Sequence, residues 1–342
     1  AIVTVADDGG SSGKLRGTLD IAPPGDLRNV LVAMSDMPRV YGQIFQYRFR
    51  AEDGPLSGHP IGNLVIAGVS EMQGSTYNAL KILSKFFHVQ GRILPSSESA
   101  LTLHAVFKDK TEIIGESRIA DYPGTIDHVY VTNTFNDEQP TASRHVVNAI
   151  MTADMIVMGP GSLFTSILPN VVIPEIREAL VRTLAQVVYV CNIMTQRGET
   201  ENFTDADHVR VLHEHVGVPF VDTVLVNVEA VPDAYMNSNK FDEYLVQVTH
   251  DFNGLQAEDV RVISANFLKL VDGGAFHNGD AVTEEINKIK EEFGRIDILV
   301  NNAGISENTS FMDYTEETFD KVIDLNVKGV FNTTRVAAEC MV

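Results

Sequence analysis

AIVTVADDGGSSG, residues 1–13, is a short apolar run that leads directly into a loop of carboxylates, glycines and serines. The apolar residues 2–5 are typical of a buried parallel strand, and a segment with helical character follows the loop. In open α/β sheets, ligands bind beyond the carboxyl ends of the strands, often against helix N-termini. A surface turn that is merely rich in glycine and serine is the alternative. The candidate ligand-binding residues are Asp7, Asp8, Gly9, Gly10 and Ser11, with both glycines expected at positive φ so that the backbone closes around a small ligand.

A second polar loop, PPGDLRN at residues 23–29, strengthens this interpretation. It places a carboxylate (Asp26), a guanidinium (Arg28) and an amide (Asn29) at the start of a predicted helix. A helix N-cap would explain Asp26 alone, but not the two polar groups beside it. We therefore expect all three in the ligand site, with Arg28 on a phosphate group.

The stretch GPGSLFTS, residues 159–166, follows a predicted strand at 155–158 and has the composition of a phosphate cradle at a helix start. Its candidate ligand contacts are Gly159, Gly161, Ser162 and Thr165. The alternative is that Ser162 simply caps the helix.

Two further loops carry candidate contacts. SGHPIGN, residues 57–63, sets a histidine between two glycines, with no second histidine at the spacing of a zinc site. YVCNIMTQRGET, residues 189–200, ends a predicted strand with polar side chains, although a purely structural strand edge is possible there. The candidates are His59, Asn63, Asn192 and Thr195.

Together, the motifs TVADDGGSSGKLR, PPGDLRNVL, SGHPIGNLVIA, MGPGSLFTSILPN and YVCNIMTQRGET resemble the YvcK-type gluconeogenesis factors of the CofD-like superfamily, from residue 1 to about 282. The resemblance implies a cytoplasmic regulatory protein that binds a nucleotide-linked metabolite, a UDP-sugar. Its role would lie in gluconeogenic carbon metabolism, cell-wall synthesis and cell shape. Arg197 stands where this family usually has proline. The family also begins about one βα unit earlier, with a GGGTG loop, so we expect the sequence to be truncated.

Strands and helices alternate through most of the chain, which predicts an α/β fold with a mostly parallel sheet. With the resemblance, this gives a Rossmann-like three-layer α/β/α architecture. The expected parallel strands lie at 2–5, 155–158, 187–191 and 223–227. Residues 92–131 differ, because short extended pieces at 101–107, 111–115 and 128–131 predict a small antiparallel excursion.

Residues 283–342 resemble a fragment of a short-chain dehydrogenase, with GRIDILVNNAGI at 294–305 and FDKVIDLNVKGVFNTTR at 319–335. Asn326 matches the asparagine of that family. The family's TGxxxGxG loop and Tyr-x-x-x-Lys pair are both missing, so we expect no dehydrogenase activity and no use of NAD(P). We divide the chain into a ligand-binding domain, 1–282, and this fragment, expected at the periphery, docked on the main domain, added to a sheet edge or paired between chains.

Charge and composition limit the classes of molecule that the protein can bind. The net charge of −20 argues against nucleic acid, and no apolar run is long enough to cross a membrane. A small molecule is the expected partner, and a homodimer is compatible with the sequence. Asp7 and Asp8 suit Mg²⁺, or equally the hydroxyls of a ribose. The alternative function is a Mg²⁺-dependent transferase related to 2-phospho-L-lactate transferase, using these carboxylates or Asp26.

Overall fold

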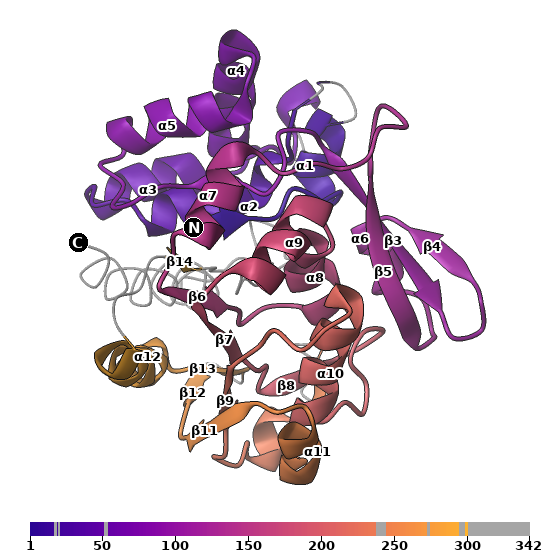
Figure 1. Cartoon of the computed structure of the whole chain (residues 1–342). Coiled ribbons are helices and arrows are strands. Elements are labelled where there is room, and N and C mark those ends of the chain that lie inside the picture. The colour runs from indigo at the N-terminus through magenta and orange to yellow at the C-terminus, as the bar shows by residue number, and fades with distance from the viewer. Residues whose placement is uncertain are drawn as a thin grey trace.

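A computed structural model describes residues 1–16, 19, 21–50, 54–236, 244–271, 274–293 and 298–299 of the chain. Within these residues, five parallel strands form the central sheet, in the order β11-β9-β7-β6-β14 (Figure 1). The strands predicted at 155–158, 187–191 and 223–227 are confirmed here, and their apolar runs are buried on both faces of the sheet. The strand predicted at 2–5 is not part of this sheet. The strands of the sheet are β6 (Met155–Met158), β7 (Gln186–Val190), β9 (Thr223–Asn227), β11 (Arg261–Ala265) and β14 (Ile298–Leu299).

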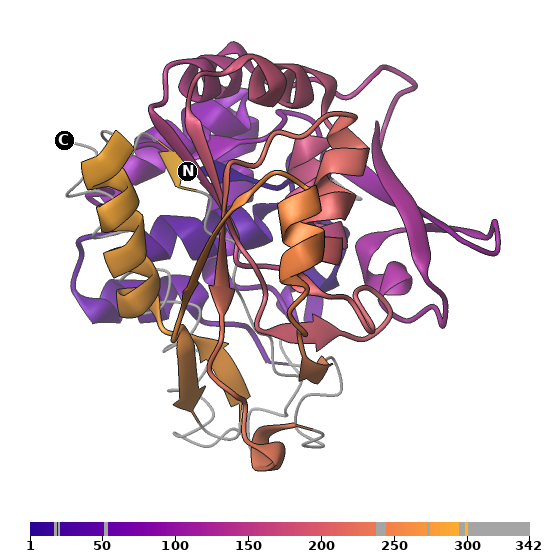
Figure 2. The same cartoon turned by 60° about the horizontal axis from the view of Figure 1, so that its bottom comes forward.

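Helices cover both faces of this sheet, which gives the expected three layers (Figure 2). Alternate strand residues point to opposite faces. One face, including Val157 and Val188, is buried with Ile286 and Ile289 of α12 (Gly279–Phe293). The other face lies in a larger core that also includes residues of α7 (Arg144–Met151), α9 (Pro174–Arg182) and α10 (Asp205–Val216).

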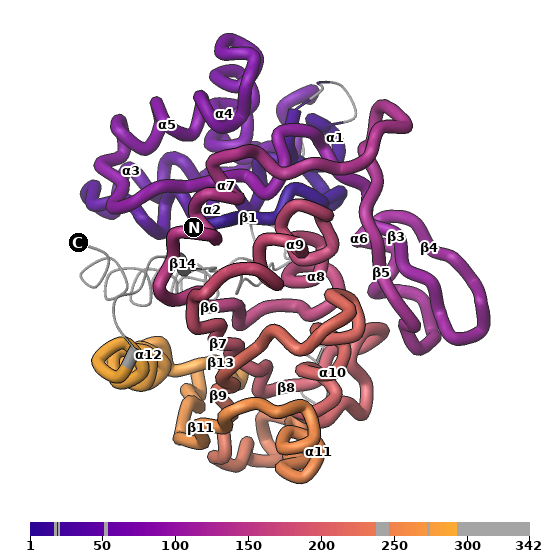
Figure 3. The backbone as a smooth tube through the Cα atoms, in the orientation of Figure 1, coloured from indigo at the N-terminus to yellow at the C-terminus, as the bar shows by residue number. Residues whose placement is uncertain are grey.

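The N-terminal part of the chain adds a strand pair and a group of helices to the same core. β1 (Ile2–Val3) pairs in parallel with β2 (Leu94–Pro95), and the backbone at Val5 continues the contact by accepting the Leu101 N–H. The tube in Figure 3 shows β1 beside α2 and β14 between this region and β6. The helices are α1 (Gly10–Arg16), α2 (Pro24–Ala33), α3 (Arg39–Gln46), α4 (Ile61–Gln73) and α5 (Thr76–Phe86).

The antiparallel excursion is confirmed as a three-stranded sheet at one side of the molecule (Figure 1). β3 (Leu101–Phe107) lies between β4 (Glu112–Ile114) and β5 (Ile126–Asn133), and the short helix α6 (Glu116–Ile119) follows β4. The buried Arg16 guanidinium joins this sheet to the first loop by donating to the backbone oxygen of Leu101 at 2.6 Å.

The remaining elements flank the central sheet. β8 (Met194–Gln196) pairs with β10 (Tyr244–Gln247), and β12 (Leu268–Val271) pairs with β13 (Gly274–His277), both antiparallel. Among the described residues, no helix is long and apolar enough to cross a membrane. The other helical pieces are a 3-10 turn (Gly54–Leu56), a π-helical turn (Leu163–Ile167), α8 (Leu168–Val171), a second 3-10 turn (Asp233–Tyr235) and α11 (Phe252–Ala257).

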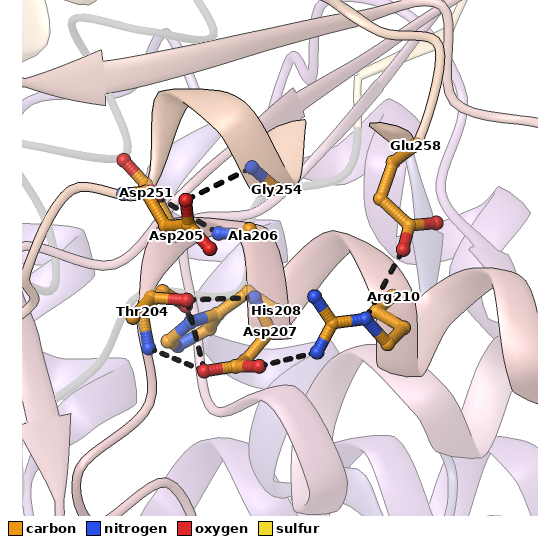
Figure 4. A network of polar contacts seen from close by, with 9 residues as sticks. All are labelled: Thr204, Asp205, Ala206, Asp207, His208, Arg210, Asp251, Gly254 and Glu258. Carbon is orange, nitrogen blue, oxygen red and sulfur yellow. Dashed lines mark hydrogen bonds and ion pairs between the residues drawn. The ribbon is translucent and has the colours of Figure 1, made fainter. Parts of the chain in front are cut away.

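A polar network ties the start of α10 to the end of α11 (Figure 4). Thr204 and Asp207 form a capping box, in which each side chain accepts the backbone N–H of the other. Arg210 donates to the Asp207 carboxylate at 2.6 Å and to the Glu258 carboxylate at 3.2 Å. Because these groups satisfy one another and the helix end, we assign the network to stability and not to ligand binding.

The predicted boundary between the ligand-binding domain and the C-terminal fragment, at 282/283, lies inside helix α12. The residues of this helix on both sides of the boundary pack into the fold. Ile286 and Ile289 are buried on the sheet, and β14 pairs in parallel with β6 at the sheet edge. Within the C-terminal segment this holds for the described residues 283–293, which pack on the sheet, and 298–299, which add to its edge. The arrangement of the segment as a whole stays a prediction. The NNAG motif at 301–304 and Asn326 lie outside the described residues.

Candidate functional site

The loop after β1 is tightly folded, and its glycines allow this conformation. The Asp7 carboxylate accepts the Gly9 N–H at 2.8 Å, which closes a turn, and Gly10 opens α1 at φ 41°. Gly9 does not have a positive φ, so that expectation was wrong for Gly9 and right for Gly10. A Cβ on Gly25 would stand 2.6 Å from Asp7 Oδ2, so the PPGDLRN loop closely approaches this carboxylate.

The Asp8 carboxylate has a different hydrogen-bond partner from the Asp7 carboxylate. Its Oδ1 accepts the Ser117 N–H at 3.0 Å at the start of α6, and Gly115, at φ 99°, leaves room for its other oxygen. The two neighbouring carboxylates therefore take separate partners. Among the described residues, no group of three or more His, Cys, Asp or Glu side chains is arranged to hold a metal. The assignment of Mg²⁺ to Asp7 and Asp8 stays a prediction.

A chain of hydrogen bonds joins three of the predicted motifs. His59 Nδ1 lies 2.8 Å from Ser11 Oγ, which accepts from Asn63 Nδ2 at 3.0 Å. The Asn63 carbonyl in turn accepts from Arg28 at 2.7 Å, and the other terminal nitrogen of Arg28 donates to Asn29 at 2.9 Å. SGHPIGN, GGSSG and PPGDLRN are thus brought together, although Ser11 and Asn29 are separated in sequence from the histidine by dozens of residues.

Burial and charge shift the ionisation of this region. Burial, followed by the charge of Asp7, raises the pKa of Asp26 to about 7. Burial and the nearby Arg48 lower the pKa of Arg28 to about 10, so its guanidinium stays charged at neutral pH. Burial, with Lys14 and Arg48, also lowers the pKa of His59. The cationic groups around His59 favour its neutral form.

GPGSLFTS forms a second network around Glu199, a residue of the RGET stretch. The hydroxyls of Ser162 and Thr165 both bond to the Glu199 carboxylate, and Ser162 also caps the following helical turn by accepting the Thr165 N–H. Gly161 donates its N–H to Asn192 Oδ1 at 3.3 Å. Ser162 therefore caps the turn, as the structural alternative expects, and its role as a ligand contact stays a prediction.

Two candidate ligand contacts of this region, Thr195 and Gly159, contact the backbone of neighbouring strands. Thr195 is buried, and its hydroxyl exchanges hydrogen bonds with the backbone N–H and oxygen of Val246, at 3.2 and 3.1 Å. Gly159 has φ 82°, and a Cβ there would stand 2.9 Å from the Val190 oxygen. The structure therefore places Thr195 in the pairing of β8 with β10 and Gly159 in the close approach of β6 to β7.

Helix α6, which begins at Glu116, lies close to both networks. Burial raises the pKa of this carboxyl well above its usual value, and the charges of Asp7, Asp26, Asp8 and Glu199 raise it further. Gly198 touches the end of α6 at Ala120, where a side chain would not fit. The first-loop carboxylates and the Glu199 network therefore lie around the same short helix, on one side of the molecule.

Sequence reasoning did not single out Glu199, which bonds to Ser162 and Thr165, or Glu116, whose pKa the neighbouring carboxyls raise. Glu116 lies in the antiparallel excursion, and nothing in its local sequence marks it as different from a surface glutamate. Glu199 belongs to the YVCNIMTQRGET motif, in which the sequence predicts only Asn192 and Thr195 as contacts. The one usable signal for Glu116 is the Ile-Gly-Glu step at 114–116, which places a glycine before the start of a helix.

Comparison with known proteins gives the family. The family model of 2-phospho-L-lactate transferase CofD matches residues 1–268. The chain belongs to the CofD family. A protein of Streptococcus pyogenes serotype M1 named "Putative gluconeogenesis factor" is 71% identical over 286 residues, which cover 84% of this chain and 88% of that protein. The "Gluconeogenesis factor" of Listeria innocua serovar 6a is 43% identical over 287 residues, covering 84% of this chain and 86% of its own.

The CofD-family fold is confirmed by a solved relative. A crystal structure of a UPF0052-family protein from Bacillus halodurans matches with a TM-score of 0.79 at 43% identity, over 84% of this chain and 90% of that one. The family model of short chain dehydrogenase matches residues 274–342. Both resemblances recognised in the sequence are therefore confirmed, and the second match begins just before α12.

Proposed function

We propose that this CofD-family chain is a cytoplasmic gluconeogenesis factor that binds a nucleotide-linked metabolite, a UDP-sugar, and acts in regulating carbon metabolism and cell shape. The observation that carries the proposal is the convergence of Arg28 with Ser11, His59 and Asn63 in one hydrogen-bonded network. Lys14 and Arg48 lie close enough to affect the ionisation of this network. A buried cationic group among polar side chains is suited to a phosphate.

Arg28 is the residue whose loss tests phosphate binding most directly. We expect Arg28→Ala to weaken a phosphate-bearing ligand by about 1.5–3 kcal/mol, the scale of a hydrogen bond to a charged group. Isothermal titration of UDP-glucose into the wild type and the variant measures this. Arg177→Ala, on the exposed face of α9, is the matched control and should bind as the wild type does. Equal affinity of the Arg28 variant and wild type would contradict the proposal.

A transferase is the second candidate, because the matching family model is that of a transferase. Ser11 Oγ lies 2.8 Å from His59 Nδ1, but it also accepts from Asn63, and no described group bonds the other ring nitrogen of His59. Because this pair lacks a third group that orients the histidine, we expect binding without sustained turnover. Incubation with UDP-glucose, Mg²⁺ and candidate acceptors, followed by chromatography of the products, checks this. Multiple turnovers that Asp26→Asn abolishes would favour the transferase instead.

A further inference from the structure

Helix α3 presents an apolar face to solvent. Val40, Tyr41 and Ile44 are 52%, 45% and 51% exposed. Val40 and Tyr41 precede Ile44 by four and three residues, so the three side chains share one side of the helix. Arg39 is the only charged residue from 37 to 47, and it belongs to another side of the helix. Single exposed apolar residues are common, but several on one helix face indicate an interaction surface.

The inner side of α3 is already packed, so the outer face is not a displaced part of the core. A Cβ on Gly42 would stand 3.1 Å from Val32 Cγ1 of α2. The Phe45 ring lies so close to Gly62 of α4 that a Cβ there would stand 2.5 Å from it. With this inner side on α2 and α4, α3 lies at the outside of the molecule, at the left of Figure 1.

More exposed apolar side chains lie close by, at the end of α5. The ring of Phe45 packs edge-on against Phe87, with 4.6 Å between centroids, and Phe87 packs against Phe86 at 5.3 Å. Phe86 is 65% exposed, and Ile82, one turn earlier on α5, is 43% exposed. A specific interface buries about 800 Å² of each partner, which is more than one short helix offers. The end of α5 supplies further apolar area beside α3.

Charges of opposite sign flank the apolar face of α3. The exposed Asp36 lies just before the helix, and the exposed Arg48 lies just after it, where it donates to the Gly58 oxygen at 2.6 Å. Two α3 helices packed antiparallel, about a two-fold axis midway between Val40 and Ile44, would bring Asp36 of one copy to Arg48 of the second. The same rotation sets Val40 against Ile44. The face is therefore complementary to itself, which a two-fold interface requires.

We propose that the outer face of α3, together with the end of α5, is the interface of a homodimer in which two copies of α3 pack antiparallel. Two chains that each carry a net charge of −20 repel one another over most of their surfaces. An apolar face with an arginine at one end and an aspartate at the other is where that repulsion is least. Antiparallel packing also sets opposite ends of the two helix dipoles side by side.

Analytical ultracentrifugation over a wide range of protein concentration tests this proposal. We expect the wild type to pass from monomer to dimer as the concentration rises. Ile44→Glu puts a carboxylate in the middle of the uncharged face and should raise the dissociation constant about a hundredfold or more. Val181→Glu, at a 47% exposed position of α9, is the matched control and should associate as the wild type does.

The charges at the two ends of α3 give a second test that leaves the apolar face intact. Asp36→Arg sets like charges together at both ends of the interface and should weaken association about tenfold. Combining Asp36→Arg with Arg48→Asp restores opposite charges across the two-fold axis. This double variant should return to within about threefold of the wild-type dissociation constant, because the two positions are coupled. Thermal melting of dilute monomer checks that each variant is folded.

Four outcomes would overturn the proposal or a defined part of it. A wild type that is monomeric at every concentration would end it, and so would a dimer that Ile44→Glu leaves unchanged. A dimer weakened by Ile44→Glu but indifferent to Asp36→Arg would overturn the antiparallel pairing. A large drop in the melting temperature of monomeric Ile44→Glu would mean that the outer face is covered within one chain. These results leave the proposed function untouched, since none of them measures ligand binding.

Discussion

Ile289→Ala is expected to lower the free energy of unfolding by about 2–5 kcal/mol, the usual cost of truncating a buried isoleucine. Ile289 is 1% exposed and lies in the cluster that covers one face of the central sheet, with Val157, Val188 and Leu225. The substitution removes apolar contacts and leaves a cavity, because the sheet behind it cannot close up. Denaturant unfolding followed by circular dichroism measures the change.

Glu291→Ala is the control for this experiment, since Glu291 is exposed on the same helix and should change stability by less than about 0.5 kcal/mol. A similar small effect of Ile289→Ala would show that α12 does not cover the sheet.

The burial of Ile289 also changes what we expect from truncating the chain after Val282. From the sequence, removal of everything after Val282 should leave ligand binding unchanged. With Ile286 and Ile289 buried beyond that point, we now expect such a chain to be strongly destabilised.

The frame of the fold could be predicted because its strands carry a strong local signal. The apolar runs at 155–158 and 223–227 became β6 and β9 with the same bounds, and the alternating pattern at 101–107 became β3. The role of α12 could not be predicted in this way. Its apolar spacing was evident, but which face of which sheet it covers depends on contacts between Ile289 and strands more than sixty residues earlier.

The same holds for the candidate site: local sequence patterns could be interpreted, but contacts between distant residues could not. Glycines, prolines and polar residues marked the loops, and the network of Ser11, His59, Asn63 and Arg28 brought three of those loops together. The raised pKa of Glu116 could not be predicted, because the fold supplies both its burial and the neighbouring carboxyls. The different hydrogen-bond partners of Asp7 and Asp8 were also hidden, since adjacent carboxylates look equivalent until Ser117 is placed beside one of them.

Asp26 should make the protein less stable as the pH rises from about 4 to 7. Burial and the charge of Asp7 raise the pKa of Asp26 from 3.8 to about 7 in the folded chain, while the unfolded chain keeps the ordinary value. Between these two values the folded state binds more protons than the unfolded state, so the free energy of unfolding falls with rising pH and levels off above about 7. At 1.36 kcal/mol per pKa unit, the difference between 3.8 and about 7 corresponds to about 4 kcal/mol.

Asp26→Asn removes the ionisable group and should therefore be more stable than the wild type at pH 8 by about 4 kcal/mol, with little difference at pH 4. Denaturant unfolding of both proteins at pH 4, 5, 6, 7 and 8 gives the two profiles. The other carboxyls titrate in both proteins, so the difference between the profiles isolates Asp26 and its coupling to Asp7. Asp137→Asn, at an exposed loop position, controls for the loss of one negative charge from an acidic protein. If both variants gave the same profile, Asp26 would be an ordinary solvated carboxylate, and the carboxyl groups around Glu116 would not be withdrawn from water as the fold indicates.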